Sequence, residues 1–198
     1  MNSSKRVEDF SLDALRSGDR AEFALLVDEY YEMIYRLAIK MVNNPQDAED
    51  ILQETFIKAY RHLEKFDGRS SLSTWLYRIA TNEALMFLRR QKPEPVSVDQ
   101  TLDTSEGEVE PLQIIDWSSL PEEELMSAEA QVYLDKAVEK LSPSLRVVFV
   151  LRDIQSLSTR ETAEVLNISE TAVKTRLSRA RLQLREELTS YYGERMHT

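Results

Sequence analysis

The sequence STRETAEVLNISETAVKTRLSRARLQLREEL, residues 158–188, predicts two helices joined by a tight turn. Ser158 is placed to cap the first helix, because Glu161 follows at the three-residue spacing of a capping box. Asn167 is expected to end this helix, and Ser169 is expected to cap the next one. The stretch therefore has the local pattern of a helix-turn-helix.

The second helix of this stretch has an apolar stripe along one side. Ile168, which precedes the helix, is expected to pack on Val173 as a hydrophobic staple and to fix the angle between the two helices. Apolar residues recur at helical spacing, which predicts a face packed on a core. They are Val173, Leu177, Ala180, Leu184 and Leu188.

Hydroxyl and cationic side chains occupy the face away from this stripe. Cations bind DNA phosphates, and Arg and hydroxyl groups can hydrogen bond to base edges in the major groove. The stretch therefore predicts a DNA-binding helix, with an ordinary surface helix carrying a solvated run of charges as the alternative. Thr171, Thr175, Ser178 and Arg179 lie on this face, flanked by Lys174, Arg176, Arg181 and Arg185.

The composition indicates a helix-rich protein of one or two domains. The chain has 198 residues with 4 Gly, 42% apolar and 30% charged residues, and no cysteine. The lack of cysteine excludes disulfides and Cys-based metal or redox sites, and it fits a reducing compartment. The first residues lack the apolar core of a signal peptide, and the longest aliphatic run, Val147–Leu151, is too short to span a membrane. A cytoplasmic protein without membrane insertion is expected.

The net charge of −10 is confined to the middle of the chain. Residues 93–126 contain 10 acidic residues and no Lys or Arg, whereas residues 1–92 have a net charge of −1 and residues 127–198 of +1. Five cations and one anion lie between Glu170 and Arg185. The acidity of the whole chain therefore does not argue against nucleic acid as a ligand of the last helix.

The predicted fold is all-α, with two small helical bundles joined by an extended acidic linker and a helix-turn-helix in the C-terminal domain. Residues 1–92 form the first domain, where Asn44-Pro45 separates two helices and a third spans about residues 72–91. Residues 93–126 form the linker and residues 127–198 the second domain. The linker is either a passive tether or a functional segment, since its apolar cluster at Leu112–Leu120 suggests docking.

No catalytic constellation is present in the sequence. His62 has no second ligand at metal spacing, His197 lies in the tail, and no Gly-rich loop could hold a phosphate. The acidic residues between Asp47 and Glu54 could form a metal cluster, but a solvated or protein-docking face is favoured. Neither an enzyme nor a cofactor or metal is expected.

Two sequence motifs point to a family and so to a function. Residues 47–90, DAEDILQETFIKAYRHLEKFDGRSSLSTWLYRIATNEALMFLRR, resemble the second conserved region of bacterial RNA polymerase sigma factors of the extracytoplasmic-function (ECF) branch. The C-terminal pattern S-x-x-E-x-A-x-x-L-x-I-S-x-x-x-V-K-x-R-L-x-R-A-R resembles the fourth region of the same family. The resemblance covers nearly the whole chain apart from the linker and termini. It implies an alternative sigma factor that binds core RNA polymerase, recognises a bipartite promoter and nucleates DNA melting.

The resemblance also assigns roles to individual residues. Residues 50–63 match the segment that binds core polymerase, and carboxylates and amides suit Arg-rich partners. The core-binding candidates are Asp50, Gln53, Glu54, Ile57, Lys58 and Arg61.

Residues 66–73 and the following helix match the part of the family that reads the downstream promoter element. Aromatic and small polar side chains suit an unstacked single strand, because aromatics stack on bases and amides bind their edges. Trp75 could equally be a core residue. The downstream candidates are Phe66, Arg69, Ser70, Trp75, Tyr77, Arg78 and Asn82, of which Tyr77, Arg78 and Asn82 are expected to face outward together with Thr81.

The helix-turn-helix matches the reader of the upstream element, and the linker matches a segment that threads the polymerase cleft. An anti-sigma factor is an expected partner beside core RNA polymerase and promoter DNA. A regulator that binds operators alone, and a helical adaptor that binds no DNA, are the alternatives. The upstream candidates are Thr171, Lys174, Thr175, Arg176, Ser178 and Arg179.

Overall fold

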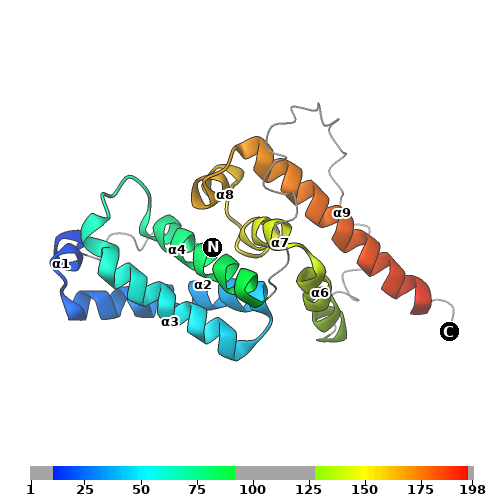
Figure 1. Cartoon of the computed structure of the whole chain (residues 1–198), viewed down its shortest axis with the longest axis horizontal. Coiled ribbons are helices and arrows are strands. Elements are labelled where there is room, and N and C mark those ends of the chain that lie inside the picture. Colours follow the sequence, from blue (N-terminus) through cyan, green and yellow to red (C-terminus); the bar gives the residue numbers. More distant parts are fainter. Residues whose placement is uncertain (1–10, 92–127, 196–198) are drawn as a thin grey trace.

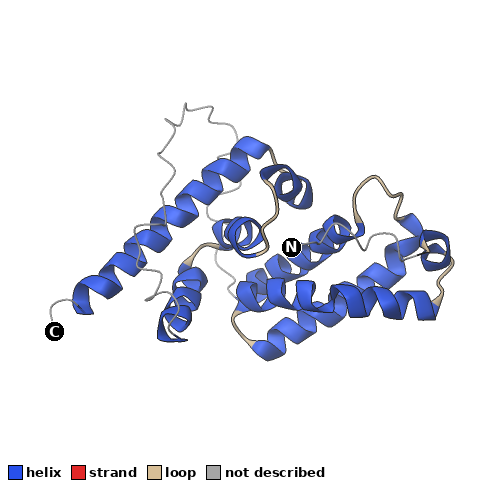
Figure 2. Cartoon of the chain, turned by 180° about the vertical axis from the view of Figure 1, so that it is seen from behind, coloured by secondary structure: helices blue, strands red, loops and turns tan. Residues whose placement is uncertain are grey.

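The computed structural model describes residues 11–91 and 128–195, with side chains for residues 11–91 and 132–189. Every regular element in these two ranges is a helix (Figures 1 and 2). The all-α prediction is confirmed. The predicted linker, with its Leu112–Leu120 cluster, lies outside the described residues.

The N-terminal half is a bundle of three long helices with a short helix at one end. Ile34, Leu37 and Met41 are fully buried in it, as is Leu76 from the last helix. Burial of such side chains stabilises the bundle by about 1.5–3 kcal/mol each. The elements are α1 (Leu12–Arg16), α2 (Arg20–Val42), α3 (Pro45–His62), the 3-10 turn η1 (Leu63–Lys65) and α4 (Leu72–Gln91).

Local sequence signals set the ends of these helices. Asn43 ends α2 in the left-handed conformation with φ 54°, and the Asn44 side chain caps α3 with Pro45 at its first position. Asp19, which has Glu22 at the capping-box spacing, caps α2 by accepting from two backbone N–H groups. Glu22 does not complete a capping box, because its Oε1 accepts a hydrogen bond from Ser11 N at 2.6 Å.

The C-terminal half packs three helices around the long α9. Its fully buried residues include Val147, Val148, Val150 and Leu184. A π-helical segment, which the sequence pattern did not predict, follows α7. The elements are α6 (Ala128–Lys140), α7 (Pro143–Phe149), the π-helical η3 (Val150–Ile154), α8 (Thr159–Leu166) and α9 (Glu170–Arg195).

The two halves pack directly on each other. Helix α8 lies against α4, and α6, α7 and η3 contact α2 (Figure 1). Buried residues of both halves belong to one continuous apolar cluster. Within the part of the chain that the structure describes, no helix has the length and apolarity needed to cross a bilayer.

Candidate nucleic-acid interface

The helix-turn-helix is capped as the sequence predicted. Ser158 Oγ accepts from Glu161 N at 3.1 Å, and Glu161 Oε2 accepts from Ser158 N at 2.7 Å, which completes the capping box. Asn167 ends α8 with φ 53°, and Ser169 Oγ accepts from Ala172 N at 3.1 Å at the start of α9. These contacts fix the turn between the two helices.

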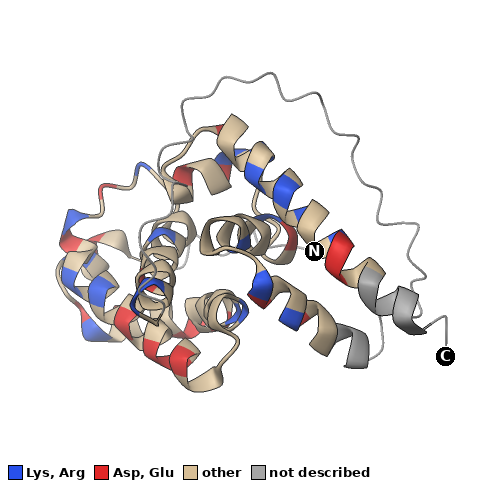
Figure 3. Cartoon of the chain, turned by 45° about the vertical axis from the view of Figure 1, so that its right-hand side comes forward, with Lys and Arg blue, Asp and Glu red and all other residues tan. Residues whose placement is uncertain are grey.

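Helix α9 buries its stripe and leaves its polar face accessible. The five stripe residues are between 0% and 8% exposed, as predicted. Bands of Lys and Arg recur along this helix in Figure 3. The upstream candidates therefore share one accessible face of the chain: Thr171, Lys174 and Arg179 are exposed, and Thr175, Arg176 and Ser178 are half-buried.

Arg181 forms an ion pair within the protein. Its Nε donates to Asp153 Oδ2 at 2.9 Å and its Nη2 donates to Asp153 Oδ1 at 2.7 Å. This bidentate pair ties α9 to the π-helical segment Val150–Ile154 and holds α9 in place. The sequence places Arg181 only among the flanking cations, because the partner lies 28 positions away.

The pKa of Glu161 gives the capping box a pH dependence. Hydrogen bonds with Ser158 hold this pKa below the ordinary value of 4.5. A lowered folded-state pKa means that the stabilisation is present above the unfolded-state value and is lost as the pH falls through the folded-state value.

We therefore expect the native chain to lose its stability advantage over Glu161→Gln as the pH falls. Gln keeps the hydrogen-bonding geometry but does not titrate. The melting temperatures of both chains, measured from about pH 7 to about pH 3, should converge in the acid range. A constant difference would contradict the assigned pKa shift.

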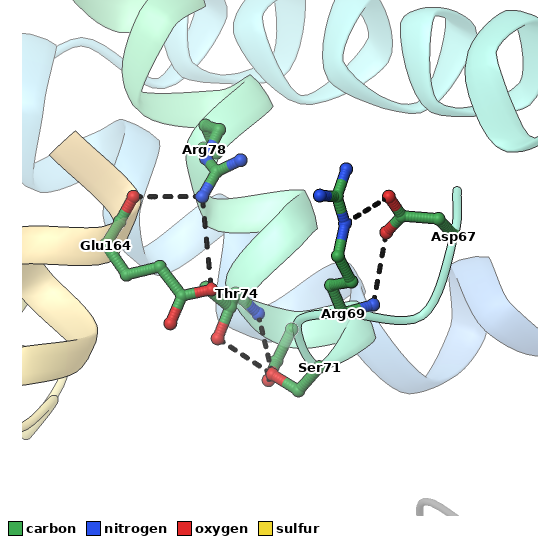
Figure 4. A network of polar contacts seen from close by, with 7 residues as sticks. Asp67, Arg69, Ser71, Thr74, Arg78 and Glu164 are labelled. Atoms are coloured by element: carbon green, nitrogen blue, oxygen red, sulfur yellow. Dashed lines mark hydrogen bonds and ion pairs between the residues drawn. The ribbon is translucent and has the colours of Figure 1, made fainter. Parts of the chain in front are cut away.

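Polar contacts join residues within the loop between η1 and α4 and at the start of α4 (Figure 4). Phe66 is 5% exposed and its ring lies 5.2 Å from that of Trp75. Asp67 accepts from Arg69 N at 3.1 Å and from Arg69 Nε at 2.5 Å, and these bonds lower the pKa of the Asp67 carboxyl. Ser71 Oγ accepts from Thr74 N at 3.1 Å and so caps α4.

The downstream candidates are accessible to very different degrees. Arg69 and Asn82 are exposed, whereas Ser70, Trp75 and Arg78 are half-buried. Phe66 is buried beneath the loop. The structure thus brings Arg69, Ser70 and Trp75 to one end of α4, with Arg78 and Asn82 farther along the helix.

The predicted outward orientation of Tyr77 and Thr81 is wrong. Tyr77 is 5% exposed, because the C-terminal half covers it. Its hydroxyl group donates a hydrogen bond to Gln155 Oε1 at 3.1 Å. Burial raises the pKa of this hydroxyl. Thr81 is fully buried and its Oγ1 donates to Tyr77 O at 2.8 Å. Helical periodicity could not show that a second bundle packs on this side of α4.

Arg16 supports the loop from the other side. Its Nε and Nη2 donate to Phe66 O at 3.0 and 2.8 Å. Gly68 has a φ of +77° and lies beside the same guanidinium. A Cβ atom added at Gly68 would be 4.0 Å from Nη2 of Arg16. No sequence motif pointed to Arg16, because it acts across 50 positions of the chain.

Replacement of Arg16 by Met is expected to lower the free energy of unfolding by about 1 kcal/mol. A hydrogen bond from a charged donor contributes about 1.5–3 kcal/mol, and the partial exposure of Arg16 reduces this figure. Urea unfolding at constant m value measures the change. Arg16→Lys, which keeps the charge on a single nitrogen, should give an intermediate value. An unchanged midpoint for the Met variant would show that the loop does not depend on this contact.

The acidic face of α3 is on the surface of the N-terminal half. Asp50, Gln53, Ile57 and Arg61 are exposed, and Glu54 and Lys58 are half-buried. Lys58 Nζ lies 3.6 Å from Glu54 Oε1 within α3 and 2.6 Å from Glu83 Oε1 of α4. Lys58, a core-binding candidate, therefore also ties α3 to α4. In the two described ranges, no three His, Cys, Asp or Glu side chains gather as metal ligands would.

Both halves match known protein families. The profile of Sigma-70 region 2 matches residues 26–94, and that of Sigma-70, region 4, matches residues 131–184. The ECF RNA polymerase sigma factor SigW of Bacillus subtilis is 40% identical over 174 residues, 88% of this chain and 92% of the relative. The ECF RNA polymerase sigma-E factor of Escherichia coli K12 is 36% identical over 171 residues, 86% of this chain and 88% of the relative.

Solved structures share the fold. CnrH in complex with the cytosolic domain of CnrY matches with a TM-score of 0.64 at 24% identity, over 90% of this chain and 95% of that chain. The sigma factor RpoE of Bartonella quintana, in complex with the anti-sigma factor NepR, matches with a TM-score of 0.60 at 24% identity, over 85% and 97%. Both sequence regions and the close relatives agree, and the chain belongs to the ECF sigma factors of bacterial RNA polymerase.

Proposed function

We propose that the two halves of this alternative sigma factor divide promoter recognition between them. Helix α9 reads the upstream element through the face that carries Lys174 and Arg179, and the loop at residues 66–71 with α4 reads the downstream element. Residues 1–92 and 127–198 are the corresponding functional domains, joined by the acidic linker. The observation that carries this proposal is the accessible polar face of α9, a helix whose first turn is capped by Ser169.

The polar face of α3 is the proposed contact with core polymerase. Asp50, Gln53 and Ile57 are exposed on it, and Glu54 lies between them. Carboxylates and an amide around an exposed apolar residue suit a partner helix rich in Arg, because Arg binds carboxylates with two parallel hydrogen bonds. Polymerase then fixes the distance between the two DNA readers, so that each needs only modest affinity.

Control by an anti-sigma factor is part of the proposal. The sigma factor RpoE of Bartonella quintana, which shares the fold, was solved with the anti-sigma factor NepR. We propose further that the chain acts in the cytoplasm as an initiation factor, without catalysis of its own and without a cofactor. Promoter melting is then driven by binding energy.

Reconstitution with core polymerase tests this function. The purified chain is added to core enzyme with a library of genomic fragments, and transcripts are sequenced. We expect initiation at a small set of promoters that share two sequence elements. Active core enzyme that yields no specific transcript with the chain would contradict the proposal, and strong operator binding by the chain alone would favour an independent regulator.

A further inference from the structure

The ion pair between Asp153 and Arg181 involves both oxygens of the carboxylate and two nitrogens of the guanidinium. Arg181 Nε donates to Asp153 Oδ2 at 2.9 Å, and Arg181 Nη2 donates to Asp153 Oδ1 at 2.7 Å. The Arg181 side chain is 26% exposed and the Asp153 side chain is 20% exposed. Hydrogen bonding to Asp153 raises the pKa of the Arg181 guanidinium above its ordinary value. Arg181 is therefore a charged residue that is turned toward the protein.

The position of Arg181 on α9 is one from which a free cation would face DNA. Lys174 and Arg185 are exposed, and they stand seven positions before and four positions after Arg181. At about 100° per residue, these spacings place the three side chains in one narrow band along the helix. A row of cations along a helix in the major groove meets DNA phosphates. Arg181 belongs to this band by position, but a carboxylate of the protein neutralises its charge.

The backbone that carries Asp153 is irregular. The segment Val150–Ile154 is π-helical, and Gln155 N donates to Val150 O at 2.8 Å. A π-helical turn contains more residues than an α-helical turn, so it changes the direction of Asp153 relative to α7. Ser156 follows with φ 59°, a conformation that is uncommon for residues other than glycine. Irregular backbone of this kind is frequent at functional sites, which favours a role for Asp153 beyond helix packing.

The packing of α9 on the C-terminal half has a separate source. Its apolar stripe is between 0% and 8% exposed, and Ser169 caps its first turn. Ion pairs of low exposure are weak evidence for stability, because removing both charges from water is costly. The pair of Asp153 with Arg181 adds to the packing of α9, and its distinct effect is to neutralise a cation beside the proposed reading face.

Neutralisation of Arg181 limits the affinity of α9 for DNA of any sequence. Contacts between cations and phosphates supply most of the sequence-independent binding and carry no sequence information directly. Polymerase links the two DNA readers, so α9 needs only modest affinity for its own element. One more phosphate contact would strengthen binding to every competing site in a genome.

We propose that Asp153 is a specificity-determining residue for the reading of the upstream element, because it keeps Arg181 away from the DNA phosphates and so lowers the sequence-independent affinity of α9. Asp153 acts through Arg181 and is a positioning residue that does not itself contact DNA. This inference rests on the proposed function, in which α9 reads the upstream element.

The salt dependence of promoter binding tests the inference, because it counts phosphate contacts. Core polymerase loaded with the full-length chain is titrated onto a fluorescent fragment that carries a promoter identified by the reconstitution. The logarithm of the binding constant falls with the logarithm of the salt concentration, with a slope that steepens by about 0.9 for each phosphate neutralised on duplex DNA.

Asp153→Asn is expected to steepen this slope by about 0.9. Asn keeps the size of the side chain but has one acceptor oxygen and no charge, so Arg181 becomes free to bind a phosphate. The double variant Asp153→Asn with Arg181→Met should return to the native slope. Arg181→Met alone should leave the slope unchanged, since the native Arg181 does not contact DNA in this proposal.

Glu32→Gln is the matched control for Asp153→Asn. It makes the same change in net charge at an exposed position of α2 and should keep the native slope. An Asp153→Asn slope equal to the native one, a slope that stays steep in the double variant, or a flatter slope for Arg181→Met would overturn the inference.

Two further outcomes separate the inference from a structural role of the pair and from the proposed function. Lower affinity of Asp153→Asn at an unchanged slope, or loss of its folded circular dichroism spectrum, would make the pair purely structural and would also overturn the inference. A native holoenzyme that binds a fragment with a scrambled upstream element as tightly as the intact promoter would instead contradict the proposed function.

Discussion

Replacement of both Lys174 and Arg179 by Glu is expected to reduce promoter-directed initiation about 100-fold while core polymerase binding is retained. Both side chains are exposed on the proposed reading face of α9. The reversed charges repel the DNA phosphates where the native cations attract them, and a cost of about 3 kcal/mol corresponds to this factor. Arg176 is left unchanged because it is half-buried and takes part in other interactions.

Transcription from a two-element promoter measures the first effect, and co-purification with core polymerase measures the second. Arg20→Glu with Lys136→Glu is the control, since both residues are exposed outside α9 and the net charge changes equally. The control should initiate normally. A reading-face variant with normal initiation would refute the assignment of α9, and equal losses in both variants would indicate a general effect of charge.

The second large effect is expected at the polar face of α3, the proposed contact with core polymerase. Asp50→Arg with Glu54→Arg should weaken association with core polymerase on the order of 100-fold, because two attractive contacts become repulsive. Asp50 is exposed, and Glu54 lies 3.6 Å from Lys58 in a partly exposed pair of small energetic value. The helix itself should therefore tolerate the change.

Titration of fluorescent core enzyme at fixed salt measures this affinity, since ionic screening alters such interactions. Glu32→Arg with Glu186→Arg makes the same change in net charge at exposed positions of α2 and α9 and should bind normally. Circular dichroism and melting temperature establish that both variants are folded. Native affinity in the α3 variant would remove Asp50 and Glu54 from the interface.

These two experiments also separate the competing functions. An operator-binding regulator would depend on Lys174 and Arg179 but not on Asp50 and Glu54. An adaptor that binds no DNA would lose binding to its protein partner in these variants. No effect on transcription specific to a promoter would be measured. An ECF sigma factor requires both faces, because polymerase binding brings the DNA readers to one promoter.

Helix boundaries and the fold class could be predicted from the sequence. Ser158 with Glu161 and Asn44 with Pro45 act on backbone groups within a few positions of themselves. The stripe that begins at Val173 is likewise a property of one helix, since its period identifies the apolar face. The accessible face of α9 followed from the same period.

Contacts between distant segments could not be predicted in this way. Arg181 pairs with Asp153 and Arg16 binds Phe66 O, and no periodic pattern connects either pair. Arg146 did leave a signal, because it interrupts the apolar run from Leu145 to Leu151. A charged residue in such a run indicates a buried partner but does not say which carbonyl receives the hydrogen bond.

The sequence by itself determined the helices, their caps, the accessible polar face of α9 and the ECF family of this protein, because these depend on neighbouring residues and on motifs. The tertiary structure alone decided that the two halves pack together and that Tyr77 and Thr81 are buried. The physical reason is that burial of a side chain on one helix depends on which other surface covers it. For Tyr77 that surface is the C-terminal half, through Gln155, 78 positions away.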